Sequence, residues 1–425
     1  MNRPAGPFGS TRPWTRNLRG PGGQLFGDPA PTPDETSFQV DNTSEDYYNS
    51  PYYAQHATEV EAVPMGPPAQ PLDLQDVLGA DFLAPMIAAN RISFHAVGDT
   101  GASSTASISN EATVADAMAA SISGAGADSG TGADAPSFCF HLGDVIYNFG
   151  EAEYYYDQFY EPFRDYDRPI FAIPGNHDGA VTYTHGGTRP DVPTLQAFIA
   201  NFCTAVPQKP QDAGGLARTT MTQPGVYFTL DAPLVSIIGI YTNVLEGPGV
   251  LTDQGGKYPA LVGDRQYDWL VGELERLAPQ RKALERAVIL ACHHPPASAD
   301  LTHGGTTGLA GDLDRAFTAA GLWPDAILSG HAHIYQRFSR SADGRQIPYI
   351  VAGSGGHATT VPPGERRGEA PHTWNEYTLE VGPTVAYGYL TATVDMSDAS
   401  ARRLIFEFTA PGDPSAADSV TIELT

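Results

Sequence analysis

Five short segments of the chain place Asp, Asn or His directly after an apolar run of β-strand character. They are VGDTG (97–101), GDVIY (143–147), GNHD (175–178), ACHHPP (291–296) and GHAHIY (330–335). Open α/β sheets build their binding sites at the carboxyl ends of strands. Carboxylate, amide oxygen and imidazole groups together suit hard or borderline metal ions of charge two or three. Each segment alone is common as a turn or as surface histidines, but their joint occurrence predicts a metal site.

The elements that must position these segments alternate along the chain. Apolar runs predict a strand before each of the five segments, and three alternating segments after residue 386 predict antiparallel strands. Helical spacing predicts helices over 72–87, 111–123, 151–166 and 264–279. In the last of these, the residues near one face are Tyr267, Leu270, Leu274 and Leu277. This order predicts an α/β sandwich that contains mixed sheets.

The charge balance limits the possible partners. The 425 residues include 24 Lys and Arg against 49 Asp and Glu, which gives a net charge of −25. An acidic protein lacks the basic patches that bind a nucleic-acid backbone or an anionic membrane surface, so neither partner is expected. No run of about twenty apolar residues is present to span a membrane. A phosphorylated substrate would therefore need a local positive centre.

Composition also divides the chain. Residues 1–70 are rich in Pro, Gly, Asn and acidic residues and predict a disordered or loosely draped tail, with a catalytic domain over 71–425. The N-terminus lacks the apolar core of a secretory signal, which makes a cytoplasmic location the default expectation. Cys139, Cys203 and Cys292 form no CxxC pair and are expected to be buried thiols. The sequence predicts neither an oligomeric state nor a role for the tail.

The series GD, GD, GNHD, HHPP and GHAH, over about residues 91–360, resembles the calcineurin-like metallophosphoesterase superfamily. This resemblance implies a four-layer α-β-β-α sandwich of two mixed sheets. Most of the superfamily opens with Asp-x-His, whereas this chain has Asp99, Thr100 and Gly101. The missing histidine, together with Tyr147 three residues after Asp144, resembles the purple acid phosphatases, as do GHAHIYQRF and IPYIVAGSGG.

The resemblance implies two metal ions that share one carboxylate. The ligands it implies for the first ion are Asp99, Asp144, Tyr147 and His333. Those for the second ion are Asp144, Asn176, His293 and His331, with His293 favoured over the adjacent His294. A phenol has a pKa of about 10, so an ion of high charge is needed to ionise it at neutral pH. In the purple acid phosphatases that ion is Fe(III), so the resemblance implies Fe(III) at the tyrosine site and Fe, Zn or Mn at the other.

The activity implied is hydrolysis of phosphate monoesters by a metal-bound hydroxide that attacks phosphorus in line with the leaving group. His177, oriented by Asp178, is expected to protonate the leaving oxygen, or else to orient a metal ligand. His303 is expected to contact the substrate phosphate, or else to be a plain loop residue. No specific role is assigned to His357.

Two other functions remain open at the level of the sequence. One is a metal-dependent phosphodiesterase that acts on cyclic nucleotides or other diesters. The other is a metal-bound binding or sensor protein without turnover. If the protein is an enzyme, its partner is expected to be a small phosphorylated substrate. The resemblance also points away from the default location, because members of the family are often exported.

Overall fold

The structure is a computed structural model that describes residues 62–102, 105–128, 132–147, 150–179, 193–244, 249, 251, 263–300, 303–357 and 370–425. The tail expected over 1–70 lies outside the described residues up to position 61. The helices are α3 (Leu74–Leu78), α4 (Ala80–Ala89), α5 (Thr105–Asp128), α6 (Gln196–Phe202), α7 (Arg265–Lys282) and α8 (Thr307–Ala320).

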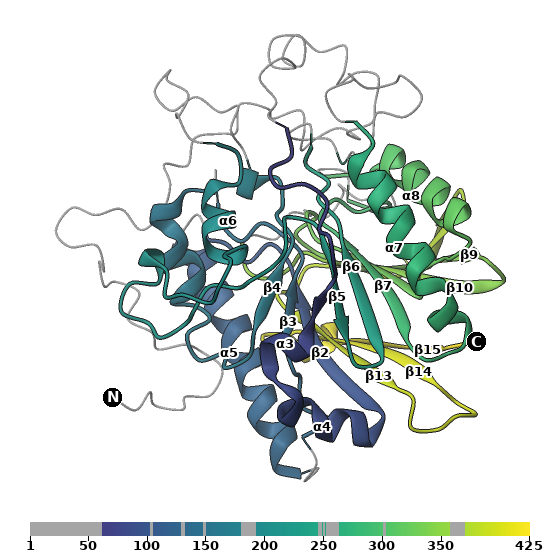
Figure 1. Cartoon of the computed structure of the whole chain (residues 1–425), viewed down its shortest axis with the longest axis horizontal. Coiled ribbons are helices and arrows are strands. Elements are labelled where there is room, and N and C mark those ends of the chain that lie inside the picture. The colour runs from purple at the N-terminus through teal and green to yellow at the C-terminus, as the bar shows by residue number, and fades with distance from the viewer. Residues whose placement is uncertain are drawn as a thin grey trace.

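The strands form two mixed sheets (Figure 1). Sheet A has the order β1-β5-β6-β7-β8-β10-β9-β12-β11, and sheet B has the order β15-β14-β13-β2-β3-β4. The strands of sheet A are β1 (Leu72–Asp73), β5 (Phe228–Ala232), β6 (Val235–Gly239), β7 (Ala287–Cys292), β8 (Ala326–Ser329), β9 (Tyr335–Ala342), β10 (Arg345–Ala352), β11 (His372–Trp374) and β12 (Tyr377–Thr384). Those of sheet B are β2 (Arg91–Val97), β3 (Cys139–His141), β4 (Ile170–Ala172), β13 (Tyr389–Asp395), β14 (Arg403–Thr409) and β15 (Asp418–Glu423).

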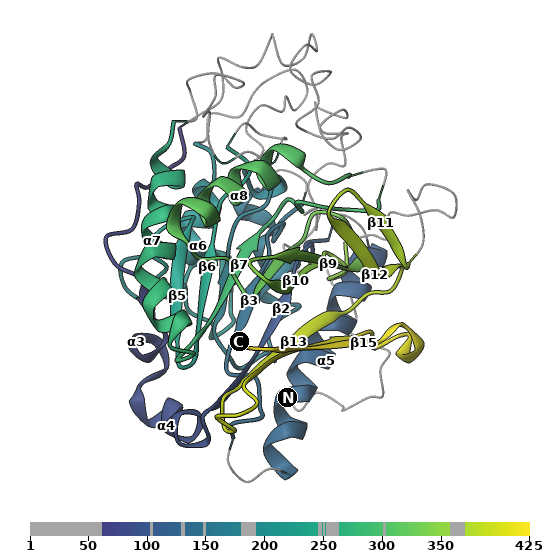
Figure 2. The ribbon, with the colours of Figure 1, turned by 90° about the vertical axis from the view of Figure 1, so that its right-hand side faces the viewer.

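Alternation along the strands separates three apolar layers. In β7, Ile289 faces sheet B while its neighbours Val288 and Leu290 face α7 and α8. In β2, Phe94 faces sheet A while Val97 packs in the layer that contains α5. Helices α7 and α8 therefore cover the outer face of sheet A, and α5 covers that of sheet B (Figure 2). The expected four-layer α-β-β-α sandwich is confirmed.

Most of the expected elements are present. Helix α7 buries Tyr267, Leu270, Leu274 and Leu277 as predicted. The C-terminal strands β13, β14 and β15 pair antiparallel, and β13 continues the sheet onto β2. The helix expected over 151–166 is wrong in type, because the segment forms a short 3-10 turn and one π-helical turn that buries its aromatic rings. Tertiary packing of these rings overrides the local helical spacing.

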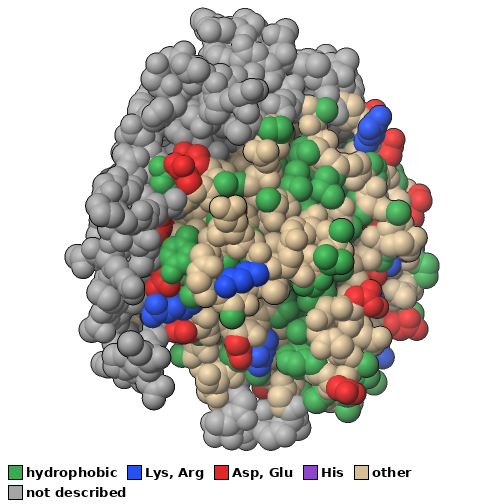
Figure 3. Space-filling model, turned by 60° about the vertical axis from the view of Figure 1, so that its left-hand side comes forward, with side chains coloured by type: hydrophobic (Ala, Val, Ile, Leu, Met, Phe, Trp, Pro, Cys, Tyr) green, Lys and Arg blue, Asp and Glu red, His purple; other side chains and the backbone are tan. Residues whose placement is uncertain are grey.

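Among the described helices, none is both long and apolar enough to cross a membrane. The face drawn in Figure 3 intersperses acidic and basic side chains with apolar ones, and its described part carries no extended basic patch. Cys139 and Cys292 are buried free thiols, and Cys203 is a partly buried one.

Candidate metal centre

The candidate site lies where five strands from both sheets end. Sheet B contributes the parallel strands β2, β3 and β4, and sheet A contributes the parallel strands β7 and β8. A backbone hydrogen bond of 3.0 Å from Gly98 N–H to Ala352 O joins the sheets beside the site. The turns after the five strands carry, in that order, Asp99, then Asp144 and Tyr147, then Asn176 to Asp178, then His293, and finally His331 and His333.

Three of these residues have a left-handed backbone. The φ angles are +57° for Asp99, +56° for Asp144 and +68° for His331. Such angles are uncommon outside glycine and cluster at functional sites. Gly143 has a φ of +99°, and a Cβ there would lie 2.6 Å from Nδ1 of His293. The GD motif needs its glycine because an imidazole packs directly against the backbone.

The phenol oxygen of Tyr147 lies among three of the predicted ligands. It is 2.8 Å from Oδ2 of Asp144, 3.2 Å from Oδ1 of Asp99 and 3.1 Å from Nε2 of His333. A Cβ at Gly101 would lie 3.0 Å from Cδ2 of Tyr147 and closer still to the neighbouring backbone. A side chain at position 101 would therefore clash with the Val145 backbone, with its Cβ 2.5 Å from the carbonyl oxygen, and would also crowd the tyrosine ring. The missing histidine of the opening motif and the presence of Tyr147 are sterically linked.

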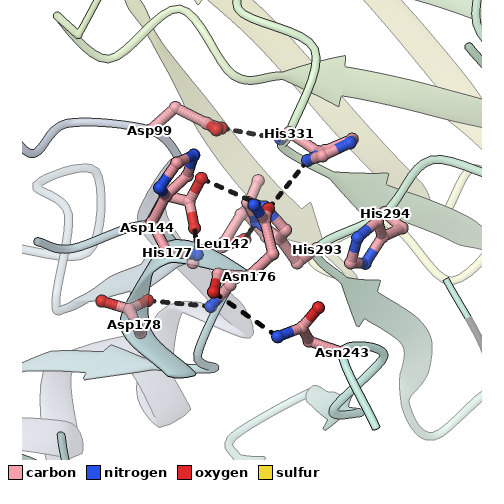
Figure 4. A network of polar contacts seen from close by, with 12 residues as sticks. Asp99, Leu142, Asp144, Asn176, His177, Asp178, Asn243, His293, His294 and His331 are labelled. Carbon is pink, nitrogen blue, oxygen red and sulfur yellow. Dashed lines mark hydrogen bonds and ion pairs between the residues drawn. The ribbon is translucent and has the colours of Figure 1, made fainter. Parts of the chain in front are cut away.

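A second group of side chains meets around Asn176 (Figure 4). Its Oδ1 is 2.9 Å from Nε2 of His293 and 2.9 Å from Nδ1 of His331. The same Nε2 of His293 is 3.4 Å from Oδ2 of Asp144. Nδ1–H of His293 donates to the carbonyl oxygen of Leu142 at 2.9 Å. This bond fixes the ring orientation and leaves Nε2 facing the site, as supporting contacts do for metal-binding histidines.

The donor set fits two metal ions. Potential ligand atoms lie within 4.8 Å of one another in two overlapping groups, Asp144 with His293 and His331, and Asp99 with Asp144 and His333. The carboxylates of Asp99 and Asp144 are fully buried. Over the ranges that the structure describes, no Lys or Arg forms an ion pair with either of them. Buried carboxylates are costly unless cations neutralise them, and two ions that share Asp144 would do so.

The electrostatics of the site follow from burial and from the two carboxylates. Burial raises the pKa of Tyr147 well above its usual value, and the adjacent carboxylates, that of Asp144 first, raise it further. The phenol therefore stays protonated unless strong positive charge lies beside it. Burial by itself lowers the pKa of His293, but Asp144 raises it to about 9. Burial and neighbouring histidines lower the pKa of His331 and His333, which favours the neutral form that binds metals.

His177 lies at the edge of this centre. Its backbone N–H donates to Oδ1 of Asp144 at 2.9 Å, and its ring centroid is 4.3 Å from that of Tyr147. The side chain is only half-buried, unlike the candidate ligands. It is therefore placed beside Asp144 without belonging to either ligand group.

That Asp178 orients His177 stays a prediction, and the structure gives the Asp178 carboxylate a further set of partners. Its carboxylate oxygens accept hydrogen bonds of 2.8 to 3.2 Å from backbone N–H groups of Gly175, Val145 and Ile146. A short carboxylate that follows a turn readily binds nearby amides. Asp178 thus ties the GNHD turn to the GDVIY turn.

His303 lies beside the candidate ligands. Its ring centroid is 5.0 Å from that of His331 and 4.8 Å from that of His333. Its Nδ1 is 2.8 Å from Oδ2 of Asp300, a fully buried residue that the sequence reasoning missed. An acid three residues before a histidine is visible in the sequence, so the contact between Asp300 and His303 could have been predicted from it.

His294 lies behind the site. Its Nδ1 is 2.8 Å from Oγ1 of Thr242, and its ring centroid is 4.4 Å from that of His331. His293, by contrast, points its Nε2 at Asp144. This placement is the one expected if His293 is the ligand and His294 supports it.

Two further residues near the centre, Asn243 and His357, were given no role from the sequence. Nδ2 of Asn243 donates to the backbone oxygen of Asn176 at 3.4 Å (Figure 4). The ring of His357 stacks on Tyr147 with centroids 3.5 Å apart and planes 13° apart. Neither contact has a local sequence signal, because each joins segments that are distant along the chain.

Comparison with known proteins agrees with this arrangement. Residues 94–335, more than half of the chain, match the family described as calcineurin-like phosphoesterase. The chain therefore belongs to the calcineurin-like phosphoesterase family, whose members are hydrolases that depend on two metal ions. The expected resemblance to that superfamily is confirmed. No protein of curated function matches the chain by sequence.

Solved structures share the fold at low identity. GAP50, the anchor in the inner membrane complex of Plasmodium, is 13% identical, with a TM-score of 0.50 over 79% of this chain and 89% of GAP50. The purple acid phosphatase PPD1 from yellow lupin (Lupinus luteus) seeds is 15% identical, with a TM-score of 0.51 over 78% of this chain. The chain spans 54% of the lupin protein. These similarities concern the fold alone.

Proposed function

We propose that this protein hydrolyses phosphate monoesters with two bound metal ions, in the manner of purple acid phosphatases. The observation that carries the proposal is the position of the Tyr147 hydroxyl, 2.8 Å from Asp144 and 3.1 Å from His333. A phenol oxygen placed among a carboxylate and an imidazole can bind a highly charged ion as phenolate. The lupin protein of similar fold is a purple acid phosphatase, which is consistent with this assignment.

The proposed centre uses each candidate ligand once, apart from the shared carboxylate. The ligands proposed for Fe(III) are Asp99, Asp144, Tyr147 and His333. Those proposed for a second ion of Fe, Zn or Mn are Asp144, Asn176, His293 and His331. Together the ions would lower the pKa of a water and neutralise charge on the phosphoryl oxygens.

The residues around the centre take the remaining roles. His177, half-buried and beside Asp144, donates a proton to the leaving oxygen. His303 binds a phosphoryl oxygen through Nε2, because its Nδ1 faces Asp300. Asp178 keeps the two turns that bear Asp144 and Asn176 at a fixed separation.

We also propose that residues 71–425 form one catalytic domain, preceded by a disordered or loosely draped tail over 1–70. Strands β13 to β15 complete sheet B beside β2, so the C-terminal segment belongs to the sheet that bears Asp99 and Asp144. At the other end, β1 pairs with β5 of sheet A. Both ends of 71–425 are therefore part of the two sheets.

Two other functions compete with this proposal. A phosphodiesterase could use the same pair of ions. Two features weigh against it: Gly101 stands where most of the superfamily has the histidine of Asp-x-His, and Tyr147 follows Asp144 by three residues. A protein without turnover is also compatible with the fold, since GAP50 is described as an anchor. The buried donor set and His177 favour an enzyme.

A substrate panel tests the proposal. The rate with p-nitrophenyl phosphate is expected to exceed that with bis(p-nitrophenyl) phosphate or a cyclic nucleotide by about tenfold or more, which corresponds to about 1.4 kcal/mol in the barrier. Asp144→Asn is the control for contaminating phosphatases and should be inactive. A diester rate above the monoester rate would support the phosphodiesterase. Equal rates for the wild type and Asp144→Asn would support a protein without turnover.

A further inference from the structure

His357 lies flat on the ring of Tyr147. The ring centroids are 3.5 Å apart and the planes differ by 13°. The histidine follows β10 in a segment that returns to the turn after β2. Its backbone N–H donates to the carbonyl oxygen of Asp99 at 3.1 Å, and the nearby Gly355 N–H donates to Gly98 O at 3.0 Å.

The orientation of this imidazole is fixed. Its Nδ1 lies 3.0 Å from the backbone oxygen of Gly101. A carbonyl oxygen only accepts hydrogen bonds, so Nδ1 carries the proton and donates it. Two hydrogen bonds, one from the backbone and one from the ring, therefore hold His357 against the turn that bears Asp99.

The tyrosine ring is confined as a result. Gly101 lies against its edge, since a Cβ there would be 3.0 Å from Cδ2 of Tyr147. His357 covers a face, and the ring of His177 makes a second, tilted contact with centroids 4.3 Å apart. The phenol oxygen lies on the long axis of a rigid ring, so rotation about that axis leaves it in place, whereas a tilt or slide of the ring would carry it away from Asp144 and His333.

We infer that His357 is a positioning residue that holds the Tyr147 phenol oxygen at the metal centre. The inference rests on the proposed function, because it gives that oxygen a metal to bind. No step of the reaction is assigned to His357 itself. It acts through the tyrosine, and by two separable contacts, the ring stack and the hydrogen bond to Gly101.

Three substitutions separate these contacts. His357→Ala removes both, His357→Phe keeps the stack, and His357→Asn keeps an amide donor for Gly101 without the ring. His372→Ala is the matched control, because His372 contacts the aromatic ring of Trp374 on the exposed strand β11, with centroids 4.4 Å apart.

The measurement is the metal retained by each purified full-length protein against rising EDTA, together with its visible absorption. Loss of a supporting contact typically lowers metal affinity about 10–100-fold. We expect a loss of this size for His357→Ala, with a weaker or shifted visible band, and retention within severalfold for His357→Phe and His372→Ala. Metal retention and a spectrum of His357→Ala equal to those of the wild type would overturn the inference, and so would an equal loss in His372→Ala.

These outcomes are distinct from failure of the proposed function. A colourless wild-type protein with two divalent ions would remove the tyrosinate assignment. The EDTA titration of His357→Ala against His357→Phe would still decide whether His357 positions the ring. Conversely, a coloured wild type whose His357→Ala variant is unchanged would overturn only the role of His357.

Discussion

The hydroxyl oxygen of Tyr147 lies 2.8 Å from Oδ2 of Asp144, three residues earlier in the same turn. The left-handed backbone of Asp144 and the glycine before it allow this turn to leave β3 abruptly. Both side chains consequently point to one place, where Asp99 and His333 also arrive from other strands. A single turn can thereby supply two ligands to one ion.

The histidine pair in HHPP offers the first prediction. His293→Ala should lose one of the two ions. It should lower kcat by at least about 10–100-fold, which is the typical loss when only a residue that supports a metal ligand is removed. His294→Ala should keep both ions, because its ring faces Thr242. Metal stoichiometry and kcat of the two variants check this, and loss of metal only from His294→Ala would reverse the assignment.

The role of His177 predicts a dependence on the leaving group. General acid catalysis contributes about 10²–10⁴-fold, and it matters most when the leaving oxygen is a poor one. His177→Ala should therefore reduce kcat strongly for an alkyl phosphate and much less for p-nitrophenyl phosphate, with unchanged metal content. Equal reductions for both substrates would exclude proton donation by this residue.

His303 and Asp300 form a pair with a separate expected signature. A hydrogen bond to a charged group is worth about 1.5–3 kcal/mol, so His303→Ala should raise KM and the inhibition constant of inorganic phosphate about 10–100-fold. Asp300→Asn should cost less, since the amide oxygen can still accept from Nδ1–H. A fall in kcat alone, with KM unchanged, would contradict phosphate binding by His303.

Asp418 links the two sheets and predicts a pH dependence of stability. It begins β15 of sheet B and accepts hydrogen bonds of 2.7 Å from Tyr335 and from Nε of Arg337, both on β9 of sheet A. Burial by itself would raise the pKa of Asp418, but these two partners hold it below its usual value. The stabilisation is therefore complete above the unfolded pKa of about 4 and is lost as pH falls through the lower folded pKa.

Urea unfolding measures this effect. Asp418→Asn should lower the free energy of unfolding by about 1–3 kcal/mol at neutral pH. The difference from the wild type should shrink as the pH drops below about 4. Asp398→Asn, at an exposed turn, is the control and should cause a much smaller loss. A deficit that grows in acid would contradict a lowered pKa of Asp418 in the folded protein.

Much of the site could be predicted because each ligand directly follows an apolar strand in its own short motif. GNHD and GHAH carry their donors within four residues, and strands that end at one edge bring such motifs together. The α/β class and helix α7 were predictable from the spacing of apolar residues. The two-sheet arrangement came from the resemblance.

The parts of the site that could not be predicted depend on contacts between segments that are distant along the chain. The stack of His357 on Tyr147 and the bond from Asn243 to Asn176 leave no periodic or local pattern. The bonds from the amides of Val145 and Ile146 to the Asp178 carboxylate likewise join two separate turns. Aromatic packing overrode the helical spacing of 151–166.

The most direct test of Tyr147 as a metal ligand is the visible absorption spectrum of the purified protein, taken with its metal content. We expect iron with a second metal and a broad visible band that disappears in Tyr147→Phe, because in purple acid phosphatases the visible absorption arises from the phenolate bound to Fe(III). A colourless protein with two divalent ions, or a band that survives in Tyr147→Phe, would contradict the assignment of Tyr147 as a ligand.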